Sequence, residues 1–396
     1  MSVDYDIVVI GGTPAGRYAA LSAAELHATV ALVEPTPPYG FIYHHALSQI
    51  AQLAVQLNDA TPLGIHAFCT DSQEQCQISL EWEAASSLAQ ALVSNLEEQH
   101  SLAILATQGV DVIIGSGEFQ SSPHLAFAVN NRKLLARTYL IATGSYPAIP
   151  DIEGLSATGY LTLLDIWQRL GKCQIPRNLI ILGGTPESIQ LAQTLSRFSC
   201  NVTLVVEKPQ ILPQVDPEIT QLLQAQLEVE GVRVLTNMAV TQVMRIQDKK
   251  WLQVGDKAIE TDEIIVATGQ QANIASLNLP AVGVKWKDNR LVVNRKLQTT
   301  NHRIYACGEV MGGYPFANLA NYEAKIALKN ALFLPISAVN YASVPWGIFS
   351  DPMLAQVGFT ETQAKRRYAA NEIIVLRQYY KTVAAAQLPD KITGIC

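Results

Sequence analysis

Near its start the chain reads Asp6-Ile-Val-Val-Ile-Gly-Gly-Thr-Pro-Ala-Gly16, and the same plan returns as Leu179-Ile-Ile-Leu-Gly-Gly-Thr-Pro-Glu-Ser188. Each stretch is a short β-branched run, then a tight glycine turn, then an Ala/Leu-rich sequence typical of a helix. A βαβ unit begins in this way, and such a turn lets backbone N–H groups and a helix N-terminus hold a pyrophosphate. Two copies predict two dinucleotide sites, and two dinucleotides indicate electron transfer between them.

Each unit also ends its second strand in a carboxylate. Glu34 lies 23 residues after Gly11, and Glu207 lies 24 residues after Gly183. An acid at the tip of the second strand is where a pair of ribose hydroxyls is held in a dinucleotide-binding fold. The alternative for Glu34 is a solvated side chain at a strand end. A strand followed by Ala-Thr-Gly occurs twice as well, so a duplicated unit is the economical interpretation.

The composition limits the class of protein. The chain has 396 residues, which leaves room for roughly two or three domains at ~150 residues each. It is 49% hydrophobic and only 16% charged, which suits parallel sheets covered by helices on both faces. The formal net charge of −6 gives no basic surface on which to argue for nucleic acid as a partner.

No segment indicates export or membrane insertion. The first residues, Met-Ser-Val-Asp-Tyr-Asp, are acidic where a signal peptide would be basic. The uncharged stretch 331–350 is long enough to cross a bilayer, but its prolines, asparagine and serines favour a buried loop and strand. Six cysteines are scattered without a CxxC spacing, which predicts free thiols and no metal site. We therefore expect a soluble, cytoplasmic chain without a membrane span.

The ordered series of motifs resembles the FAD-dependent pyridine nucleotide–disulfide oxidoreductases, especially the dihydrolipoamide dehydrogenase and mercuric reductase branch. The segments that carry the likeness cover nearly the whole chain and are 6–34, 140–145, 179–207, 212–218, 265–273, 299–308, 349–352 and 357–361. The resemblance implies an α/β fold with two Rossmann-like dinucleotide-binding domains and an incomplete α+β interface domain. The implied boundaries are 1–150 and 271–343 for the FAD-binding domain, 151–270 for an inserted NAD(P)-binding-like domain, and 344–396 for a truncated dimerisation-like domain.

The resemblance assigns an FAD site to the first unit. It implies that the glycine loop holds the pyrophosphate, that Glu34 holds the adenosine ribose, and that Gly117 lies on the adenine side. Glu309 matches an aspartate whose carboxylate accepts a hydrogen bond from the ribityl chain, and here the side chain is one methylene longer. The full set of implied FAD residues is Gly11, Gly12, Thr13, Pro14, Ala15, Gly16, Glu34, Gly117, Ala142, Thr143, Gly144, Gly308, Glu309, Ala317 and Asn318.

The second unit is expected, on the same resemblance, to hold a nicotinamide dinucleotide. Glu207 favours NADH over NADPH, because a 2′-phosphate at that place would face a like charge. The implied residues of this NAD-like site are Gly183, Gly184, Thr185, Pro186, Glu187, Glu207 and Gly269.

The redox disulfide of the family is missing. The stretch 35–46, which follows the first ribose acid, is shorter than the family's loop and contains no cysteine or lysine. Reduction of disulfides or of mercuric ion by that dithiol is therefore excluded. In its place, Tyr39, Tyr43, His44 and His45 fall where the reactive face of the flavin is expected. Either this Tyr–His cluster stacks on the ring and exchanges protons near neutral pH, which predicts catalytic roles for Tyr43, His44 and His45, or it fills the space left by the deleted loop.

Both glycine loops also depart from the family pattern. Their third position is a threonine, Thr13 or Thr185, where glycine normally lets the backbone approach the pyrophosphate. In the first loop the threonine hydroxyl is a candidate donor to a phosphate. In the second loop the last glycine is Ser188, and Gln190 takes a place that the family usually gives to glutamate, so we expect weakened helix–strand packing there. NADH, another adenine dinucleotide, a looser site or no ligand are the alternatives for this second loop.

Two functions fit these observations. The first is an FAD-dependent enzyme that takes hydride from NADH and passes electrons to a quinone, a small electron carrier or oxygen. The second is a non-catalytic flavin protein, a regulator or assembly partner with a decayed nicotinamide site. The chain ends at Cys396 in what resembles the early part of the family's dimerisation domain, without its His-Glu pair. We expect either a homo-oligomer that completes this sheet or an incomplete version of the domain.

Overall fold

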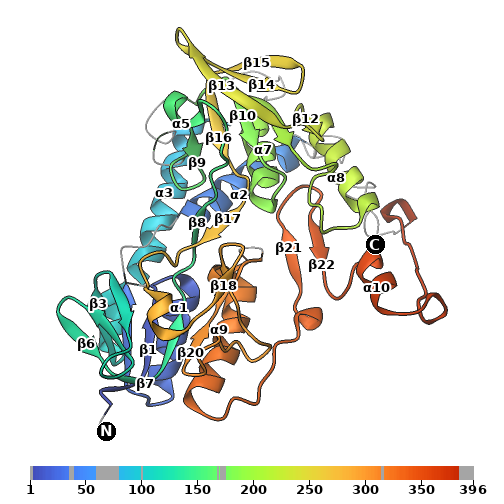
Figure 1. The fold of residues 1–396 in the computed structure, drawn as a ribbon. Helices are drawn as coiled ribbons and strands as arrows, with labels where there is room; N and C mark the ends of the chain where they lie inside the picture. Colours follow the sequence, from blue (N-terminus) through green and yellow to red (C-terminus); the bar gives the residue numbers. More distant parts are fainter. Residues whose placement is uncertain are drawn as a thin grey trace, which may run out of the picture. The chain divides into compact units, whose positions relative to one another are not determined.

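The structure, a computed structural model, describes residues 3–34, 40–58, 80–99, 101–166, 169, 175–313 and 316–382. The chain divides into two compact units (Figure 1), and each glycine loop lies in a different one. The first unit consists of Met1–Pro38, Asn95–Ala148 and Gln270–Trp346, and the second of Tyr39–Ser94, Ile149–Gly269 and Gly347–Cys396. The division into three domains, with the boundaries given above, stays a prediction.

The first unit is built on a five-stranded parallel sheet. Its strands, in spatial order, are β20 (Ile304–Ala306), β7 (Ala136–Ile141), β1 (Tyr5–Ile10), β2 (Val30–Glu34) and β3 (Val110–Ile114). At the carboxyl end of β1, Ile10 is level with Ile141 of β7 and with Val33 of β2. The first glycine loop, the first Ala-Thr-Gly segment and Glu34 therefore meet at one edge of the sheet, where ligands of parallel α/β sheets bind.

Helices α1 (Pro14–Glu25) and α9 (Ala317–Leu332) pack together over this sheet. Alternate side chains of β1 point to opposite faces, so β1 serves two cores. Val9 lies in the core that these helices form, whose buried alanines include Ala19 and Ala324, and such small side chains allow a close approach. Ile10 lies in the other core, which contains Phe119 and Phe127.

The remaining elements of the first unit are short. An antiparallel sheet contains β4 (Gly117–Gln120), β5 (Ala126–Val129) and β6 (Arg132–Leu134), and two-stranded sheets pair β8 (Ser145–Pro147) with β17 (Gln270–Ala272) and β18 (Trp286–Lys287) with β19 (Arg290–Leu291). The helical pieces are α4 (Leu102–Thr107), η2 (Leu279–Val282), η3 (Gly308–Met311) and η4 (Tyr341–Ser343).

The second unit repeats the plan of the first. Its parallel sheet has the order β12 (Arg233–Thr236), β11 (Asn201–Val206), β10 (Asn178–Leu182), β16 (Glu263–Val266) and β9 (Leu161–Thr162). Leu182, the last residue of β10, is level with Val205 and Val266. The second glycine loop and the second Ala-Thr-Gly segment therefore meet at the carboxyl edge of this sheet as well. This repetition confirms the predicted α/β class with parallel sheets.

The other elements of the second unit surround that sheet. Its helices are α2 (Gly40–Asn58), α5 (Leu155–Thr158), α7 (Pro186–Arg197), α8 (Pro217–Val229), α10 (Glu361–Arg367), η5 (Ala370–Glu372) and η6 (Tyr380–Thr382). Its other strands are β13 (Val240–Ile246), β14 (Lys249–Val254), β15 (Lys257–Thr261) and β22 (Leu354–Gln356), while α3 (Trp82–Gln99) and β21 (Trp346–Ile348) contain residues of both units.

A run with high strand propensity does not form a strand. Residues 372–379 are rich in β-branched and aromatic side chains, but after η5 this run lies outside any helix or strand until η6, apart from a single bridge residue. Ile374 and Leu376 are 85% and 84% exposed, so no neighbouring sheet covers this run within the described residues. A strand needs a partner for its backbone groups, and local propensity does not supply one.

Candidate functional site

The first glycine loop is shaped by three contacts that leave no room for side chains. Gly11 has φ +109°, and a Cβ on it would lie 2.4 Å from the carbonyl oxygen of Ala142. A Cβ on Gly16 would lie 2.0 Å from the carbonyl oxygen of Gly11, and one on Gly12 would lie 2.0 Å from Cδ of Glu34. These three positions therefore require glycine for different reasons: backbone conformation, the entry of α1, and the space that Glu34 occupies.

The hydroxyl of Thr13 makes two hydrogen bonds that stabilise the loop. Its Oγ1 donates to the carbonyl oxygen of Ala142 (2.8 Å) and accepts from the backbone N–H of Gly16 (3.3 Å), so it is the N-cap of α1. Pro14 follows as the first helical residue, where its missing N–H costs nothing. A hydroxyl has one proton, and here it points at Ala142. The expectation that this hydroxyl donates to a phosphate is therefore corrected, and the N–H groups of the first turn of α1 are the donors in reach of an anion.

Glu34 ends β2 beneath the loop and is only 1% exposed. One carboxylate oxygen, Oε1, accepts a hydrogen bond from the guanidinium of Arg17, which is itself buried and also donates to the carbonyl oxygen of Gly12 (3.1 Å). The other oxygen, Oε2, is buried and has no hydrogen-bond partner among the residues that the structure describes. Burial raises the pKa of Glu34, and the charge and hydrogen bond of Arg17 lower it in part.

The Ala-Thr-Gly segment continues the same edge of the sheet. Oγ1 of Thr143 donates to the carbonyl oxygen of Asn273 (2.7 Å), and the N–H of Asn273 donates to the carbonyl oxygen of Gly144 (3.0 Å). Gly144 has φ +67°, which glycine adopts without strain. These bonds join the segment before β8 to the residue after β17. Ala15, another implied FAD residue, is buried in the core under α1.

Two further carboxylates lie close to the backbone of η3, one on η3 itself and one on α9. Glu309 accepts a hydrogen bond from the hydroxyl of Ser145, and burial raises the pKa of Glu309. Glu323, on α9, accepts from the N–H of Gly308 (2.8 Å) and from the hydroxyl of Tyr341 (2.9 Å). Glu323 is 4% exposed, and this burial raises its pKa to about 7. Sequence reasoning missed Glu323, although an acid on the alanine-lined face of α9 was a readable signal.

The other implied FAD residues have simple surroundings. Ala317 and Asn318 begin α9 and are exposed, and the amide of Asn318 donates to the carbonyl oxygen of Pro345 (2.6 Å). Gly117 begins β4, where a Cβ would lie 2.3 Å from the carbonyl oxygen of Ala128 on β5. Gly117 therefore permits the close pairing of β4 and β5.

The second glycine loop has nearly the same construction as the first. Gly183 has φ +135°, and Thr185 caps α7 by accepting from the N–H of Ser188 (3.3 Å) while donating to the carbonyl oxygen of Ala267 (3.2 Å). The hydroxyl of Ser188 lies 3.1 Å from the carbonyl oxygen of Gly183 and 2.8 Å from that of Thr185. Because Ser188 is completely buried and hydrogen-bonded, the expected weakening of the helix–strand packing is not observed.

The charges around the two loops differ. Glu207 follows β11 and is exposed, whereas its counterpart Glu34 is buried. Arg17 corresponds in position to Ile189, which is completely buried. Glu187 lies in the first turn of α7 and is 5% exposed, which adds an acid where an anion would approach. Among the other implied residues, Pro186 starts α7, Gly184 packs beside β11, and Gly269 has φ +132° with open space around its Cα.

The Tyr–His cluster lies on α2, in the second unit. Tyr43 hydrogen-bonds through its hydroxyl to Ser86, and the ring of His45 meets Phe349 edge to face at 4.9 Å. His44 is 4% exposed, and burial lowers its pKa to about 4. His44 therefore stays uncharged near pH 7, so proton exchange at neutral pH does not suit it. Tyr39 lies outside the described residues.

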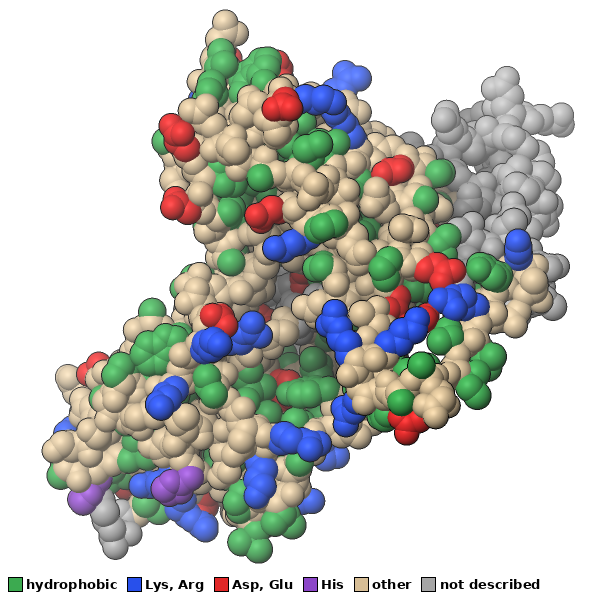
Figure 2. Space-filling view, turned by 45° about the vertical axis from the view of Figure 1, so that its right-hand side comes forward, with side chains coloured by type: hydrophobic (Ala, Val, Ile, Leu, Met, Phe, Trp, Pro, Cys, Tyr) green, Lys and Arg blue, Asp and Glu red, His purple; other side chains and the backbone are tan. Residues whose placement is uncertain are grey.

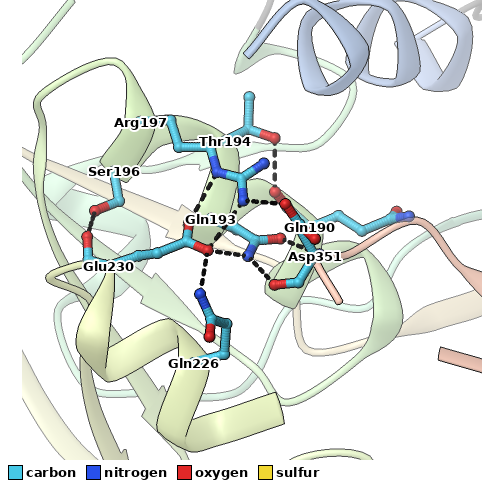
Figure 3. Close-up of polar contacts among 8 residues, drawn as sticks. All are labelled: Gln190, Gln193, Thr194, Ser196, Arg197, Gln226, Glu230 and Asp351. Carbon is cyan, nitrogen blue, oxygen red and sulfur yellow. Dashed lines mark hydrogen bonds and ion pairs between the residues drawn. The ribbon is translucent and has the colours of Figure 1, made fainter. Parts of the chain in front are cut away.

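Further along from its glycine loop, α7 carries a partly buried polar network that sequence reasoning did not foresee (Figure 3). Arg197 donates to both carboxylate oxygens of Glu230 (2.8 and 2.9 Å) and to Asp351 (3.1 Å). Gln193 donates to Glu230 (2.8 Å) and to the carbonyl oxygen of Asp351 (2.7 Å), and its own amide oxygen accepts from the N–H of Asp351 (2.8 Å). This network fixes the segment that follows β21 to α7 and to the end of α8.

On the face drawn in Figure 2, basic and acidic side chains are interspersed with hydrophobic ones. No helix in the described part of the chain is long and apolar enough to cross a membrane. Likewise, the described residues contain no cluster of three or more His, Cys, Asp or Glu side chains that could hold a metal ion.

The two glycine-loop units, each with its Ala-Thr-Gly segment at the carboxyl edge of a parallel sheet, define a fold with two Rossmann-like dinucleotide-binding units. The chain belongs to the pyridine nucleotide-disulphide oxidoreductase family, whose model matches residues 5–324. Members of this family use FAD and NAD(P)H. The resemblance drawn from the sequence is thereby confirmed.

Among individual relatives, the chain is similar to mercuric reductase of Staphylococcus aureus, with 30% identity over 374 residues. That match covers 92% of this chain and 66% of the relative, and a mercuric reductase of Bacillus cereus is covered over only 57% of its length. A dihydrolipoyl dehydrogenase of Bacillus subtilis is 29% identical, with 91% and 79% covered. The chain thus spans about two thirds or less of the length of the mercuric reductases of Staphylococcus aureus and Bacillus cereus.

Solved structures agree on the fold. The crystal structure of LpdA from Mycobacterium tuberculosis has a TM-score of 0.84 with 24% identity, and covers 98% of this chain and 85% of that one. The HOCl-induced flavoprotein disulfide reductase RclA from Escherichia coli has a TM-score of 0.80 with 24% identity, and covers 99% and 85%.

The residues of the first unit fit FAD. A buried carboxylate oxygen without a partner is rare in folded proteins. Within the described ranges Oε2 of Glu34 is such an acceptor, at the place where a ribose hydroxyl would donate. Gly11, Gly12 and Gly16 keep side chains away from the first turn of α1, whose N–H groups face the loop. The donor set and the acceptor therefore suit the adenosine diphosphate part of the cofactor.

Proposed function

We propose that this protein is an FAD-dependent oxidoreductase that takes hydride from NADH and passes electrons to an acceptor other than a disulfide. When bound, FAD supplies the redox chemistry, and the protein supplies binding and electrostatics. A quinone, a small electron carrier or oxygen are the candidate acceptors. A homo-oligomer in the cytoplasm remains part of this proposal.

The observation that carries the proposal is the chemistry of the thiols. The stretch 35–46 has no cysteine, so the dithiol of the family has no counterpart at that place. Within the described residues the thiols are those of Cys200 and Cys307, and both are buried. Burial raises the pKa of Cys200 to about 12 and the pKa of Cys307 further. Since the thiolate is the reactive species, neither side chain suits thiol–disulfide exchange.

The preference for NADH is supported by Glu207. Its carboxylate is exposed at the end of β11, at the place where ribose hydroxyls bind in a dinucleotide-binding fold. A 2′-phosphate would meet this negative charge, whereas two ribose hydroxyls would donate to it. Ser188 does not stand against binding, because the loop around it keeps the conformation of the first loop.

A second candidate is a flavin-binding regulator or assembly partner without catalysis. Glu187 favours it, because a buried acid in the first turn of α7 opposes a pyrophosphate at that helix N-terminus. In that case the second unit holds another adenine dinucleotide or none.

Anaerobic rapid mixing decides between the two. The purified flavoprotein is mixed with NADH or NADPH while the visible absorbance of the oxidised flavin, which is lost on reduction, is followed. We expect bleaching with NADH. A matched variant, Glu187→Gln, removes one negative charge from the first turn and should bleach at least as fast. If neither nucleotide bleaches the flavin in either protein, the enzyme proposal fails and the regulator remains.

A further inference from the structure

We propose that Arg17 is a positioning residue of the adenosine site: it binds one oxygen of Glu34 and so leaves the other as the single acceptor for one ribose hydroxyl of FAD. The inference rests on FAD binding in the first unit and not on the choice of electron acceptor. It assigns a role to a side chain outside the set of FAD residues that the resemblance implies.

The first step is the geometry of the guanidinium. Arg17 is the fourth residue of α1, and its Nε donates to the carbonyl oxygen of Gly12 (3.1 Å). A terminal nitrogen of the same group donates to Oε1 of Glu34. The planar guanidinium thus bridges the glycine loop and the end of β2, and it fixes which carboxylate oxygen faces the helix.

The second step is burial. The side chains of Arg17 and Glu34 are 9% and 1% exposed. A carboxylate that loses water tends to take up a proton, and the adjacent positive charge opposes this. Arg17 therefore keeps Glu34 in the form that accepts hydrogen bonds from hydroxyls, while Oε2 is left buried without a partner in the described part of the chain.

The third step is a comparison within the molecule. The second loop has the same threonine N-cap and the same proline, but Ile189 stands in the position of Arg17. The loop itself therefore forms without an arginine at this position. The acid at the end of the second strand also differs between the two units, since Glu207 is exposed and Glu34 is buried. We infer that Arg17 serves Glu34 and not the turn.

The test uses the full chain, freed of flavin and titrated with four flavins while flavin fluorescence reports binding. These are FAD, two FAD analogues that lack the 2′- or the 3′-hydroxyl of the adenosine ribose, and FMN, which lacks the adenosine. In the wild type, one deoxy analogue should bind about tenfold more weakly than FAD, as expected for a hydrogen bond to a charged acceptor, and the other within about twofold.

Arg17→Ile, which copies the second loop, should weaken FAD and abolish the difference between FAD and both analogues, while FMN affinity stays within about twofold. Arg17→Lys and Glu34→Gln, which keep more of the packing, should each reduce the same difference. Arg137→Ile, which removes an exposed ion pair with Asp6 in the same unit, should change nothing.

The proposal is overturned if Arg17→Ile, or Arg17→Lys where the first does not fold, discriminates between FAD and the analogues as the wild type does. Equal weakening of FMN and FAD also overturns it, since that marks general damage, and so does equal binding of all three dinucleotides to the wild type. FAD binding without reduction by NADH would defeat the proposed function and leave this inference intact. Failure of the wild type to bind FAD would remove both.

Discussion

Thr13 and Thr185 occupy the same place in the two glycine loops. Each donates its hydroxyl to the carbonyl oxygen of the alanine that begins the neighbouring Ala-Thr-Gly segment, Ala142 or Ala267. Each also caps the helix that follows. The threonine thus replaces the family's glycine by a side chain that points away from the ligand edge and ties two segments together.

Thr13→Val should therefore destabilise the first unit. It keeps the shape of the side chain but removes the cap and the bond to Ala142, and loss of an N-cap costs about 1 kcal/mol. Thr13→Ser keeps both bonds and is the matched control. Thermal unfolding with and without FAD measures the effect. Equal melting temperatures for the valine and serine variants would show that the hydroxyl does not stabilise the loop.

The sequence predicts what depends on neighbours along the chain. Strand, glycine turn and helix are local, so the two loops and the acids Glu34 and Glu207 could be placed from spacing alone. The partners of these groups could not, because Arg17 reaches Glu34, and Glu323 reaches Gly308, only after the sheet and helices pack. Both missed residues are charged side chains on otherwise apolar helix faces, a signal that shows burial but not the partner.

The long-range contacts of the C-terminal segment were hidden for the same reason. The carboxylate of Asp216 accepts from the N–H groups of Glu361 (2.8 Å) and Thr362 (3.2 Å), and so caps α10 from 145 residues earlier in the chain. In the exposed run 372–379, by contrast, the local sequence has high strand propensity, but without an adjacent sheet no strand forms.

The pH dependence of stability should reveal Glu323. Its pKa is raised from 4.5 to about 7 in the folded state, so between these values the folded chain holds a proton that the unfolded chain has released. Stability from this group is complete below pH 4.5 and is lost as the pH rises through 7, by up to ~3 kcal/mol. Glu323→Gln does not titrate and should flatten this slope.

His44 contributes to the pH dependence of stability with the opposite sign. Its pKa is lowered from 6.5 to about 4, so its stabilisation is lost as the pH falls below 6.5. The difference between wild type and Glu323→Gln, measured by denaturant unfolding at each pH, isolates the carboxyl from this histidine. A difference that is constant from pH 5 to 8 would mean that Glu323 ionises normally.

The network on α7 should be sensitive to loss of its cation. Arg197→Met removes the guanidinium from Glu230 and Asp351, whose side chains are 15% and 13% exposed, and breaking a largely buried ion pair in this way costs ~3 kcal/mol. Arg132→Met removes an ion pair whose partners are 51% and 41% exposed, and should cost less than ~1 kcal/mol. Urea unfolding compares the two variants, and similar losses in both would contradict the assigned role of the network.

The nucleotide preference is the most direct measure of the second site. Glu207→Arg replaces a negative charge at the end of β11 with a guanidinium, which binds phosphate oxygens bidentately. The ratio of kcat/KM for NADPH to that for NADH should rise by roughly tenfold or more, because the repulsion of the 2′-phosphate becomes attraction. The rise should shrink at high salt, since Glu207 is exposed and screening weakens exposed charges.

Glu228→Arg is the matched control for this change, because it makes the same charge reversal at an exposed position on α8, away from β11. It should leave the ratio unchanged. If Glu207→Arg moves the ratio no more than Glu228→Arg does, the carboxylate does not face the ribose. The acid spacing would then mark a strand end and not a binding site, and the choice between the two nucleotides would have to lie in the first turn of α7, where Glu187 is buried.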